Sequence, residues 1–338
     1  MKKIISILLI LTLMLSVVAC SNGGGEEGTS GPKKIKVAHW FAEDHPQHIA
    51  LLKFKEVLEE SSNGAFVVEV YPNSQLGSED VYDDSVSQGT VEMAATGTLI
   101  QKWVPQIAVT EAPFLFDGWD DAQEILTGEI GEFIVQDLPE AANMKCVALT
   151  VNGFRQMSSN KSMYNMQELA GQRFRTPNIP HFIKMMDQLG AVSVPMPMSE
   201  IFTALETKVV DGQENPYPTI YTSSFYEVQD YVLESNHMFS PNFWVVNNDF
   251  YNGLSDEDRA HFDAAIKEAA DYNWEISRQA NDEAKAAIEA EGTEIIIPSE
   301  EFKAQMKDAM EPVYEYFYEQ SSESEEIVTR IREYQEAN

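Results

Sequence analysis

Positive charge is scarce in this sequence. The 338 residues hold 23 Lys and Arg against 55 Asp and Glu, which gives a formal net charge of -32 at pH 7. A protein that binds a phosphate backbone needs a basic face, and a helix that lies on anionic lipid needs basic residues beside the membrane. The charge therefore argues against nucleic acid as a partner and against a helix lying on an anionic membrane surface.

Cysteine is also scarce, and the common catalytic motifs are missing. Cys20 and Cys146 are too few for a disulfide framework or a four-thiolate zinc site. There is no glycine-rich nucleotide loop, no HExxH and no GxSxG motif, and His45 and His48 lack a carboxylate at the spacing of a zinc site. We expect no metal and no cofactor. Catalysis by paired carboxylates stays open, because 55 acidic residues always offer pairs.

The remaining composition is that of a folded protein. Hydrophobic residues make up 43% of the chain and aromatic residues 10%, which is too much for a disordered chain. The length allows roughly two domains. Cys146 lies in the apolar run 145–149, where we expect the thiol to pack as a small hydrophobic group rather than act as a nucleophile.

The first residues have the sequence pattern of an export signal. Two lysines precede an apolar run at 4–18, which is short for a membrane span and is followed by Ala19 and Cys20. The end of this run resembles a lipobox, so we predict a lipoprotein signal peptide at 1–20 with lipid attachment at Cys20. The alternative is an ordinary signal peptide with an incidental cysteine. Residues 21–32 contain five glycines and no apolar side chain, which predicts a flexible tether.

Strand-like and helix-like segments alternate through the body of the chain. Strands are predicted at 34–38, 66–71, 91–96, 144–151, 171–176, 192–194, 209–213 and 236–247, and helices at 45–60, 78–88, 120–138, 179–189, 199–207 and 299–337. Residues 217–231 are expected to be poor in helix. This alternation predicts an α/β fold with a mainly parallel sheet. Residues 255–290 have helical composition without Pro or Gly, and such a helix is long enough to span two lobes.

Three of the seven arginines fall close together, at Arg155, Arg173 and Arg175. In a strand, Arg173 and Arg175 would project to the same face while Phe174 faces the core. A guanidinium group is a planar donor that meets a carboxylate with two parallel hydrogen bonds. The cluster therefore fits an anion site, and it fits equally a set of surface salt bridges to neighbouring acids.

Four strings in this order resemble one known family, the DctP-type extracytoplasmic solute receptors of TRAP transporters. They are YPNSQLGSE at 71–79, APFLF at 112–116, NGFR at 152–155 and VDGQENP at 210–216. The resemblance covers about residues 33–330. It implies a two-lobe, periplasmic-binding-protein-like (Venus flytrap) α/β fold with a long helix spanning both lobes. We expect lobe I at 33–152 plus about 240–280, and lobe II at 153–239 plus about 281–338.

The resemblance also implies a function. The receptor would bind an organic anion between its lobes, without catalysis, and deliver it to the membrane subunits of a TRAP permease driven by an ion gradient. We expect a monomer outside the cytoplasm, attached to the cell membrane through the lipid at Cys20, on the periplasmic side or at a Gram-positive cell surface. We expect hinge closure at Asn152 and Gly153 and at residues 239–241.

Site residues follow from the same resemblance. Arg175 matches the arginine that clamps the substrate carboxylate, Arg155 matches a second contact, and Asn215 matches the asparagine that reaches the ligand. Looser candidates are the ends of two strands and several side chains that could shape the cleft: His39, Trp40, Glu43, Thr96, Met198, Tyr217 and Trp244. Many relatives carry an aromatic residue at the position of Met198, so the ligand of a relative cannot be assigned directly to this protein.

Three functions remain open from the sequence. A transport receptor is the first, with a sugar acid such as a hexuronate or aldonate slightly preferred over a C4-dicarboxylate, because Trp40, Glu43, Asn215 and Tyr217 could bond hydroxyl groups. The second is a sensory binding module of a membrane kinase. The third is a surface enzyme that acts on acidic sugars.

Overall fold

The computed structural model describes residues 31–338, of which Lys33–Asn338 form one compact unit. The predicted signal peptide at 1–20, the attachment site at Cys20 and nearly all of the tether at 21–32 lie outside the described residues. Within residues 31–338, no helix is both long and apolar enough to cross a membrane.

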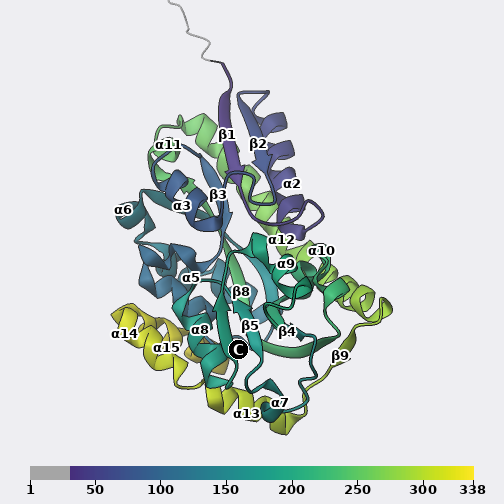
Figure 1. Ribbon diagram of the computed structural model, residues 1–338. Helices are drawn as coiled ribbons and strands as arrows, with labels where there is room; N and C mark the ends of the chain where they lie inside the picture. Colours follow the sequence, from purple (N-terminus) through teal and green to yellow (C-terminus); the bar gives the residue numbers. More distant parts are fainter. Residues whose placement is uncertain (1–30) are drawn as a thin grey trace, which may run out of the picture. The chain divides into compact units, whose positions relative to one another are not determined.

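One nine-stranded sheet runs through this unit (Figure 1). Its strands follow the order β2-β1-β3-β8-β4-β7-β5-β6, and β9 pairs with β8. The bounds are β1 (Lys33–Ala38), β2 (Phe66–Tyr71), β3 (Met93–Thr96), β4 (Met144–Ser159), β5 (Arg173–Thr176), β6 (Val192–Pro195), β7 (Gly212–Pro216), β8 (Tyr231–Asn247) and β9 (Glu294–Ile296).

The sheet is mixed. Five of its eight strand pairs are parallel, among them the pairs of β1 with β2 and β3 that the alternation predicts, but a long antiparallel pair was not expected. The pairs β1–β2, β1–β3, β5–β6, β5–β7 and β8–β9 are parallel. The pairs β3–β8, β4–β8 and β4–β7 are antiparallel. The parallel pairs lie on both sides of a long antiparallel pair, β4 and β8, which alternation of strands and helices along the sequence does not reveal.

Strands β4 and β8 are much longer than predicted. They pair from Met144, opposite Asn247, to Ser159, opposite Tyr231, with register shifts that include one at Gly153. Gly153 has a φ of +126°, which glycine adopts without strain, so the chain bulges there and the strand continues. Strand β3 pairs with one end of this ribbon and β7 with the other, so the ribbon joins the two halves of the sheet.

The helices cover both faces of the sheet (Figure 1). The α-helices are α2 (Pro46–Ser61), α3 (Glu79–Ser87), α4 (Trp119–Thr127), α5 (Glu129–Val135), α6 (Leu138–Ala142), α7 (Met166–Leu169), α8 (Pro180–Gln188), α9 (Ile201–Glu206), α10 (Tyr217–Thr222), α11 (Asn248–Asn252), α12 (Asp256–Ala290), α13 (Glu300–Met310), α14 (Val313–Gln320) and α15 (Ser322–Ala337). Short 3-10 helices are η1 (Thr98–Lys102), η2 (Pro105–Glu111), η3 (Met198–Glu200) and η4 (Phe225–Val228).

Three helix predictions differ from the structure. The single helix expected at 120–138 is divided: Gly128, extended with φ −101° and ψ −165°, separates α4 from α5, and a second break at Gln136 and Asp137 separates α5 from α6. The helical tail is divided into α13, α14 and α15: Pro312 directly precedes α14, and the Ser321 side chain accepts from the backbone N–H of Glu323 and caps α15. Residues 217–231, expected to be poor in helix, contain α10 and η4.

The long helix predicted at 255–290 is confirmed as α12. The hydroxyl oxygen of Ser255 accepts a hydrogen bond from the backbone N–H of Asp258 at 3.1 Å and caps its start. Phe262 and Ala265 pack in the hydrophobic cluster that includes β1, β2 and α2. Near the other end, Ala284 and Ile288 pack in a separate cluster with α9 and α10. Between them, Trp274 packs in a third cluster, so one helix takes part in three hydrophobic clusters.

Candidate functional site

A small cavity of about 50 Å³ lies beside the centre of the sheet. Four neighbouring strands contribute polar side chains to its wall: Ser240 and Asn242 from β8, Arg155 from β4, Asn215 from β7 and Arg175 from β5. Glu79, Thr98 and Glu111, from α3, η1 and η2, add to its polar lining. The strand residues are far apart in sequence, and strand order brings them to one place.

The first arginine of this cavity, Arg155, already has a carboxylate partner. Its Nε and Nη2 donate to the two carboxylate oxygens of Glu214, the latter at 2.8 Å, and Nη2 also donates to the Glu214 carbonyl at 2.6 Å. Its Nη1 donates to the Ser240 hydroxyl at 3.3 Å. Burial alone would raise the pKa of Glu214, but Arg155 and His237 hold it below its ordinary value. The charge of Arg155 is therefore balanced inside the protein.

The second arginine, Arg175, has no such partner. Its side chain is 5% exposed, and its Nε and Nη2 donate to the backbone carbonyl of Met196 at 3.0 and 2.8 Å. No carboxylate among residues 31–338 forms an ion pair with it, and its other N–H groups remain for the cavity. Burial lowers the pKa of Arg175 to about 9, because the cation loses hydration and the nearby charges of Glu214 and Glu79 offset this loss only in part. The site thus holds a buried guanidinium group without a direct ion-pair partner among residues 31–338.

The third arginine of the cluster lies outside the cavity. Arg173 donates to both carboxylate oxygens of Asp211, at 3.2 and 3.0 Å, and to the carbonyl of Lys208 at 2.9 Å. The surface salt-bridge interpretation thus describes Arg173 but not the buried Arg155 and Arg175. Arg173 and Arg175 belong to the same strand, with the fully buried Phe174 between them.

Five of the ten predicted ligand contacts line this cavity, namely Arg155, Arg175, Asn215, Trp40 and Met198. Among the other five, Glu43 is exposed to solvent. The Tyr217 hydroxyl donates to Glu234 at 2.9 Å, and Tyr217 packs in the cluster around α10.

The other three predicted contacts are fully buried outside the cavity. Nε2 of His39 lies 3.0 Å from Nδ1 of His48. The Thr96 hydroxyl lies behind the cavity wall, 3.0 Å from a carboxyl oxygen of Glu79. The indole N–H of Trp244 donates to the side chain of Gln47 at 2.9 Å. Each of these three side chains therefore has a partner within the protein.

Sequence analysis missed several residues of the cavity wall: Glu79, Glu111, Ile179, Phe182, Ser240 and Asn242. A signal exists for the two acids. Glu79 ends the string at 71–79, and Glu111 directly precedes the string at 112–116. Glu111 accepts hydrogen bonds from the Thr98 hydroxyl and, at 3.2 Å, from Nε2 of His181.

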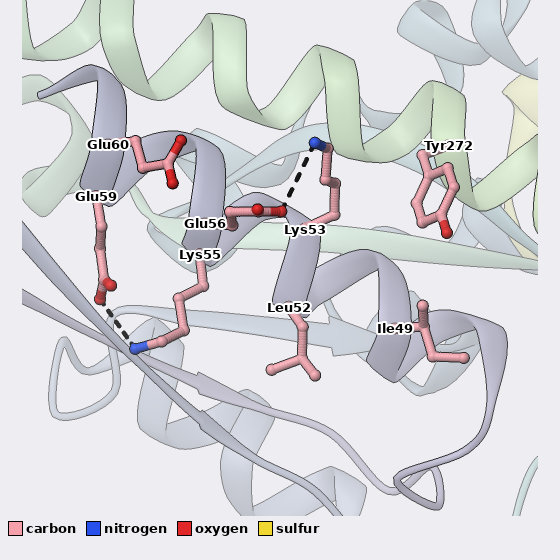
Figure 2. A pocket seen from close by; sticks show the side chains of 8 residues that line it. All are labelled: Ile49, Leu52, Lys53, Lys55, Glu56, Glu59, Glu60 and Tyr272. Atoms are coloured by element: carbon pink, nitrogen blue, oxygen red, sulfur yellow. Dashed lines mark hydrogen bonds and ion pairs between the residues drawn. The ribbon is translucent and has the colours of Figure 1, made fainter.

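A larger hollow of about 750 Å³ lies on the surface between α2 and α12 (Figure 2). Both of its lysines are already paired, with Lys55 2.9 Å from Glu59 and Lys53 3.7 Å from Glu56. Ion pairs this exposed contribute little to stability, and they leave the hollow without an unpaired cation for an anionic ligand. The buried cavity is the better candidate, because it holds a cation that lacks a partner.

Among residues 31–338, the groups that would indicate metal or thiol chemistry are not assembled. In the part of the chain that the structure describes, no group of three or more His, Cys, Asp or Glu side chains could hold a metal ion. Burial raises the pKa of the Cys146 thiol to about 12, so this group is protonated at neutral pH.

The sequence model of one family, "bacterial extracellular solute-binding protein, family 7" (DctP), matches residues 37–321. The C4-dicarboxylate-binding periplasmic protein DctP of Rhodobacter capsulatus is 32% identical over 310 residues, which are 90% of each chain.

Solved structures of TRAP periplasmic solute binding proteins are similar to the whole body of the chain. One from Haemophilus influenzae, with bound L-gulonate, is 37% identical, with a TM-score of 0.86 over 89% of this chain and 99% of that chain. One from Desulfovibrio desulfuricans, with bound sn-glycerol-3-phosphate, is 31% identical, with a TM-score of 0.87 over 90% and 97%. The predicted two-lobe α/β fold is thereby confirmed. The ligands named for these relatives belong to different classes.

Proposed function

Because the chain belongs to family 7 of the bacterial extracellular solute-binding proteins, the receptors of TRAP transporters, we propose that Arg175 binds the carboxylate of its organic acid ligand. The observation that carries this proposal is the buried, unpaired guanidinium of Arg175 in the wall of the cavity. A buried cation is costly without a counter-ion, and a ligand carboxylate supplies one. The net charge of -32 repels an anion at long range, so this local cation must supply the attraction.

Arg155 has a supporting role in this proposal. Its contacts with Glu214 and Ser240 fix the plane of its guanidinium group before any ligand arrives. A pre-formed site loses less side-chain entropy on binding. Arg155 can add one further N–H to the ligand, while Arg175 provides the guanidinium group that has no carboxylate partner among residues 31–338.

Ligand binding would close the two lobes about the β4–β8 ribbon. The two predicted hinge segments are paired with each other there, Gly153 opposite Ser240 and Val151 opposite Pro241. Ser240 also lines the cavity, so a change in backbone conformation at this point would alter the contacts between the cavity wall and the ligand. The lobe boundaries at 33–152 plus about 240–280, and at 153–239 plus about 281–338, belong to this proposal.

The receptor would act as a monomer, held at the outer face of a membrane by a lipid on Cys20, and would release its acid unchanged to the TRAP permease. Lipid attachment is tested by mass spectrometry of the mature N-terminus. Incubating the protein with a bound acid and recovering that acid unaltered tests the absence of catalysis.

The binding proposal is tested by a thermal-shift screen of the purified protein against aldonates, hexuronates, C4-dicarboxylates and sn-glycerol-3-phosphate. A ligand at a hundred times its dissociation constant stabilises a protein by about 2.7 kcal/mol, which is a readable rise in Tm. Arg175→Gln should lose the shift. Arg173→Gln is the matched control in the same strand and should keep it. A shift retained in Arg175→Gln would refute the assigned role.

A further inference from the structure

The direction of the hydrogen bonds around the cavity indicates what kind of acid it takes. Apart from Arg175, three side chains of the wall, Asn215, Asn242 and Glu79, present oxygen atoms that no protein group uses. An oxygen of this kind accepts a hydrogen bond, so it needs a donor from the ligand. Carboxylates bring acceptors only, whereas hydroxyl groups bring donors.

A chain of amide side chains fixes the orientation of Asn215. The Nε2 of Gln229 donates to two backbone carbonyls, so its Oε1 must accept from the Ser158 hydroxyl, at 3.0 Å. The Ser158 oxygen then accepts from Nε2 of Gln213 at 2.9 Å. This leaves Oε1 of Gln213 to accept from Nδ2 of Asn215 at 2.6 Å. The carbonyl oxygen of Asn215 therefore remains for the cavity.

Asn242 leaves a second acceptor without a partner. Its Nδ2 donates to the carbonyl of Pro241 at 2.9 Å, and its Oδ1 is buried with no hydrogen bond. The residue is 1% exposed and lines the cavity. An unpaired buried amide oxygen is costly in a protein interior. A ligand hydroxyl would remove this cost.

Glu79 supplies a third acceptor, and its charge state follows from its neighbours. Its Oε1 accepts from the backbone N–H of Gly97 at 2.6 Å and lies 3.0 Å from the Thr96 hydroxyl. The same hydroxyl lies 3.0 Å from Oδ2 of Asp83, although it has one hydrogen to give. One of the two acids must therefore donate to Thr96. Burial raises the pKa of both acids, and that of Asp83 well above its ordinary value. Asp83 is the donor, since Oε1 of Glu79 already accepts from the backbone N–H of Gly97.

Glu79 therefore faces the cavity with a free oxygen, Oε2, and its partner Asp83 is a neutral carboxylic acid. Glu111, the other acid of the wall, accepts from Thr98, His181 and Ser240 and adds negative charge. A second ligand carboxylate would meet these acids and find no unpaired cation, because Arg155 is bound to Glu214. Like charges brought together in a buried site cost several kcal/mol.

We propose that the cavity selects a monocarboxylate with several hydroxyl groups, its carboxylate on Arg175 and its hydroxyls donating to Glu79, Asn215 and Asn242, and that it excludes dicarboxylates. This inference rests on the proposed function. It goes beyond the relatives, whose named ligands include both a sugar acid and C4-dicarboxylates.

A matched ligand pair tests the selection by isothermal titration calorimetry on the purified full chain. L-gulonate and D-glucarate share their carbon chain and hydroxyl pattern, and differ in that a second carboxylate replaces the terminal hydroxymethyl group. We expect L-gulonate to bind at least about 100-fold more tightly than D-glucarate, and succinate to give no binding heat. Comparable affinities for L-gulonate and D-glucarate, or tight binding of succinate, would overturn the inference and leave the proposed function standing. Failure of every acid would overturn the proposed function itself.

Variants then connect the selection to the named residues. Glu79→Gln removes the charge and places an amide at the cavity wall, so L-gulonate should bind at least about 10-fold more weakly and the preference over D-glucarate should narrow. Glu60→Gln, on the exposed face of α2 (Figure 2), is the matched control. It should keep both the affinity for L-gulonate and the preference for L-gulonate over D-glucarate. An unchanged preference in Glu79→Gln, in a variant whose Tm shows that it is folded, would refute the role of Glu79.

Discussion

Arg155 donates hydrogen bonds to both carboxylate oxygens of Glu214 inside the protein, whereas Arg175, which lines the same cavity, has no carboxylate partner among the described residues. The two arginines thus have different tasks although they lie in one wall. A paired arginine provides a fixed surface, and an unpaired one provides charge for the ligand.

Breaking the Arg155–Glu214 pair should destabilise the protein strongly. Glu214→Gln leaves the guanidinium of Arg155 buried without its counter-charge, and such changes cost about 3–5 kcal/mol in free energy of unfolding. Urea unfolding measures the loss. Asp271→Asn, which breaks the exposed pair with Lys267, is the control and should cost less than about 1 kcal/mol. An equal loss in free energy of unfolding for the two variants would contradict the role of the Arg155–Glu214 pair as a buried, charge-balanced contact.

Asp83 should make stability depend on pH. Its pKa is raised in the folded protein, so the folded state holds its proton at pH values where the unfolded chain has released it. Stability contributed by this group is therefore complete below the unfolded pKa of about 4 and is lost as pH rises towards the folded pKa, by up to about 1.4 kcal/mol per pH unit.

The variant Asp83→Asn removes this titration and tests its sign. Relative to wild type, Asp83→Asn should gain stability steadily between pH 4 and pH 8 in urea unfolding, because the asparagine amide can donate to Thr96 without a proton to lose. Asp84→Asn, the next and exposed residue of α3, should follow the wild-type pH profile. If the stability of Asp83→Asn changes with pH in the same way as that of the wild type, Asp83 is ionised in the folded protein.

A side chain at Gly153 should disturb the ribbon. The residue has a φ of +126°, and a Cβ there would lie 3.3 Å from both the Pro216 side chain and the Trp119 ring. Gly153→Ala should therefore lower the free energy of unfolding by at least about 1 kcal/mol. Gly118→Ala, where nothing lies within 4 Å of the added Cβ, should be near neutral. A neutral Gly153→Ala would show that the backbone relaxes freely at this bulge.

Ligand should also make the protein more compact. If the lobes close about the ribbon at Gly153 and Ser240, small-angle scattering should give a smaller radius of gyration with a bound acid than without it. Arg175→Gln at the same acid concentration should show no change. The same radius for the free and bound wild-type protein would contradict closure.

The residues of the cavity were predictable where they belong to a distinctive string. Arg155 and Asn215 lie in two of the four strings, and Arg175 is one of few arginines. Glu79 also ends one of these strings, but the string alone does not tell which of its side chains reaches the cavity. Asn242 was hidden because its role depends on strand order: it reaches the cavity only because β8 lies beside β4.

The failures of sequence analysis have the same origin. Trp244 is two residues beyond Asn242 and shares its face of β8 by alternation, but α2 covers it there and Gln47 bonds its indole. The antiparallel ribbon of β4 and β8 was missed because its pairing joins residues about a hundred positions apart. Local patterns give the elements, whereas long-range pairing decides which side chains reach the cavity.

The role of Arg175 is tested most directly by a crystal structure of the protein with the tightest-binding acid of the screen. We predict that a carboxylate oxygen of this acid lies about 2.7–2.9 Å from an Nη atom of Arg175, as in charge-assisted hydrogen bonds. A carboxylate held by other residues, with Arg175 still unpaired, would contradict the account.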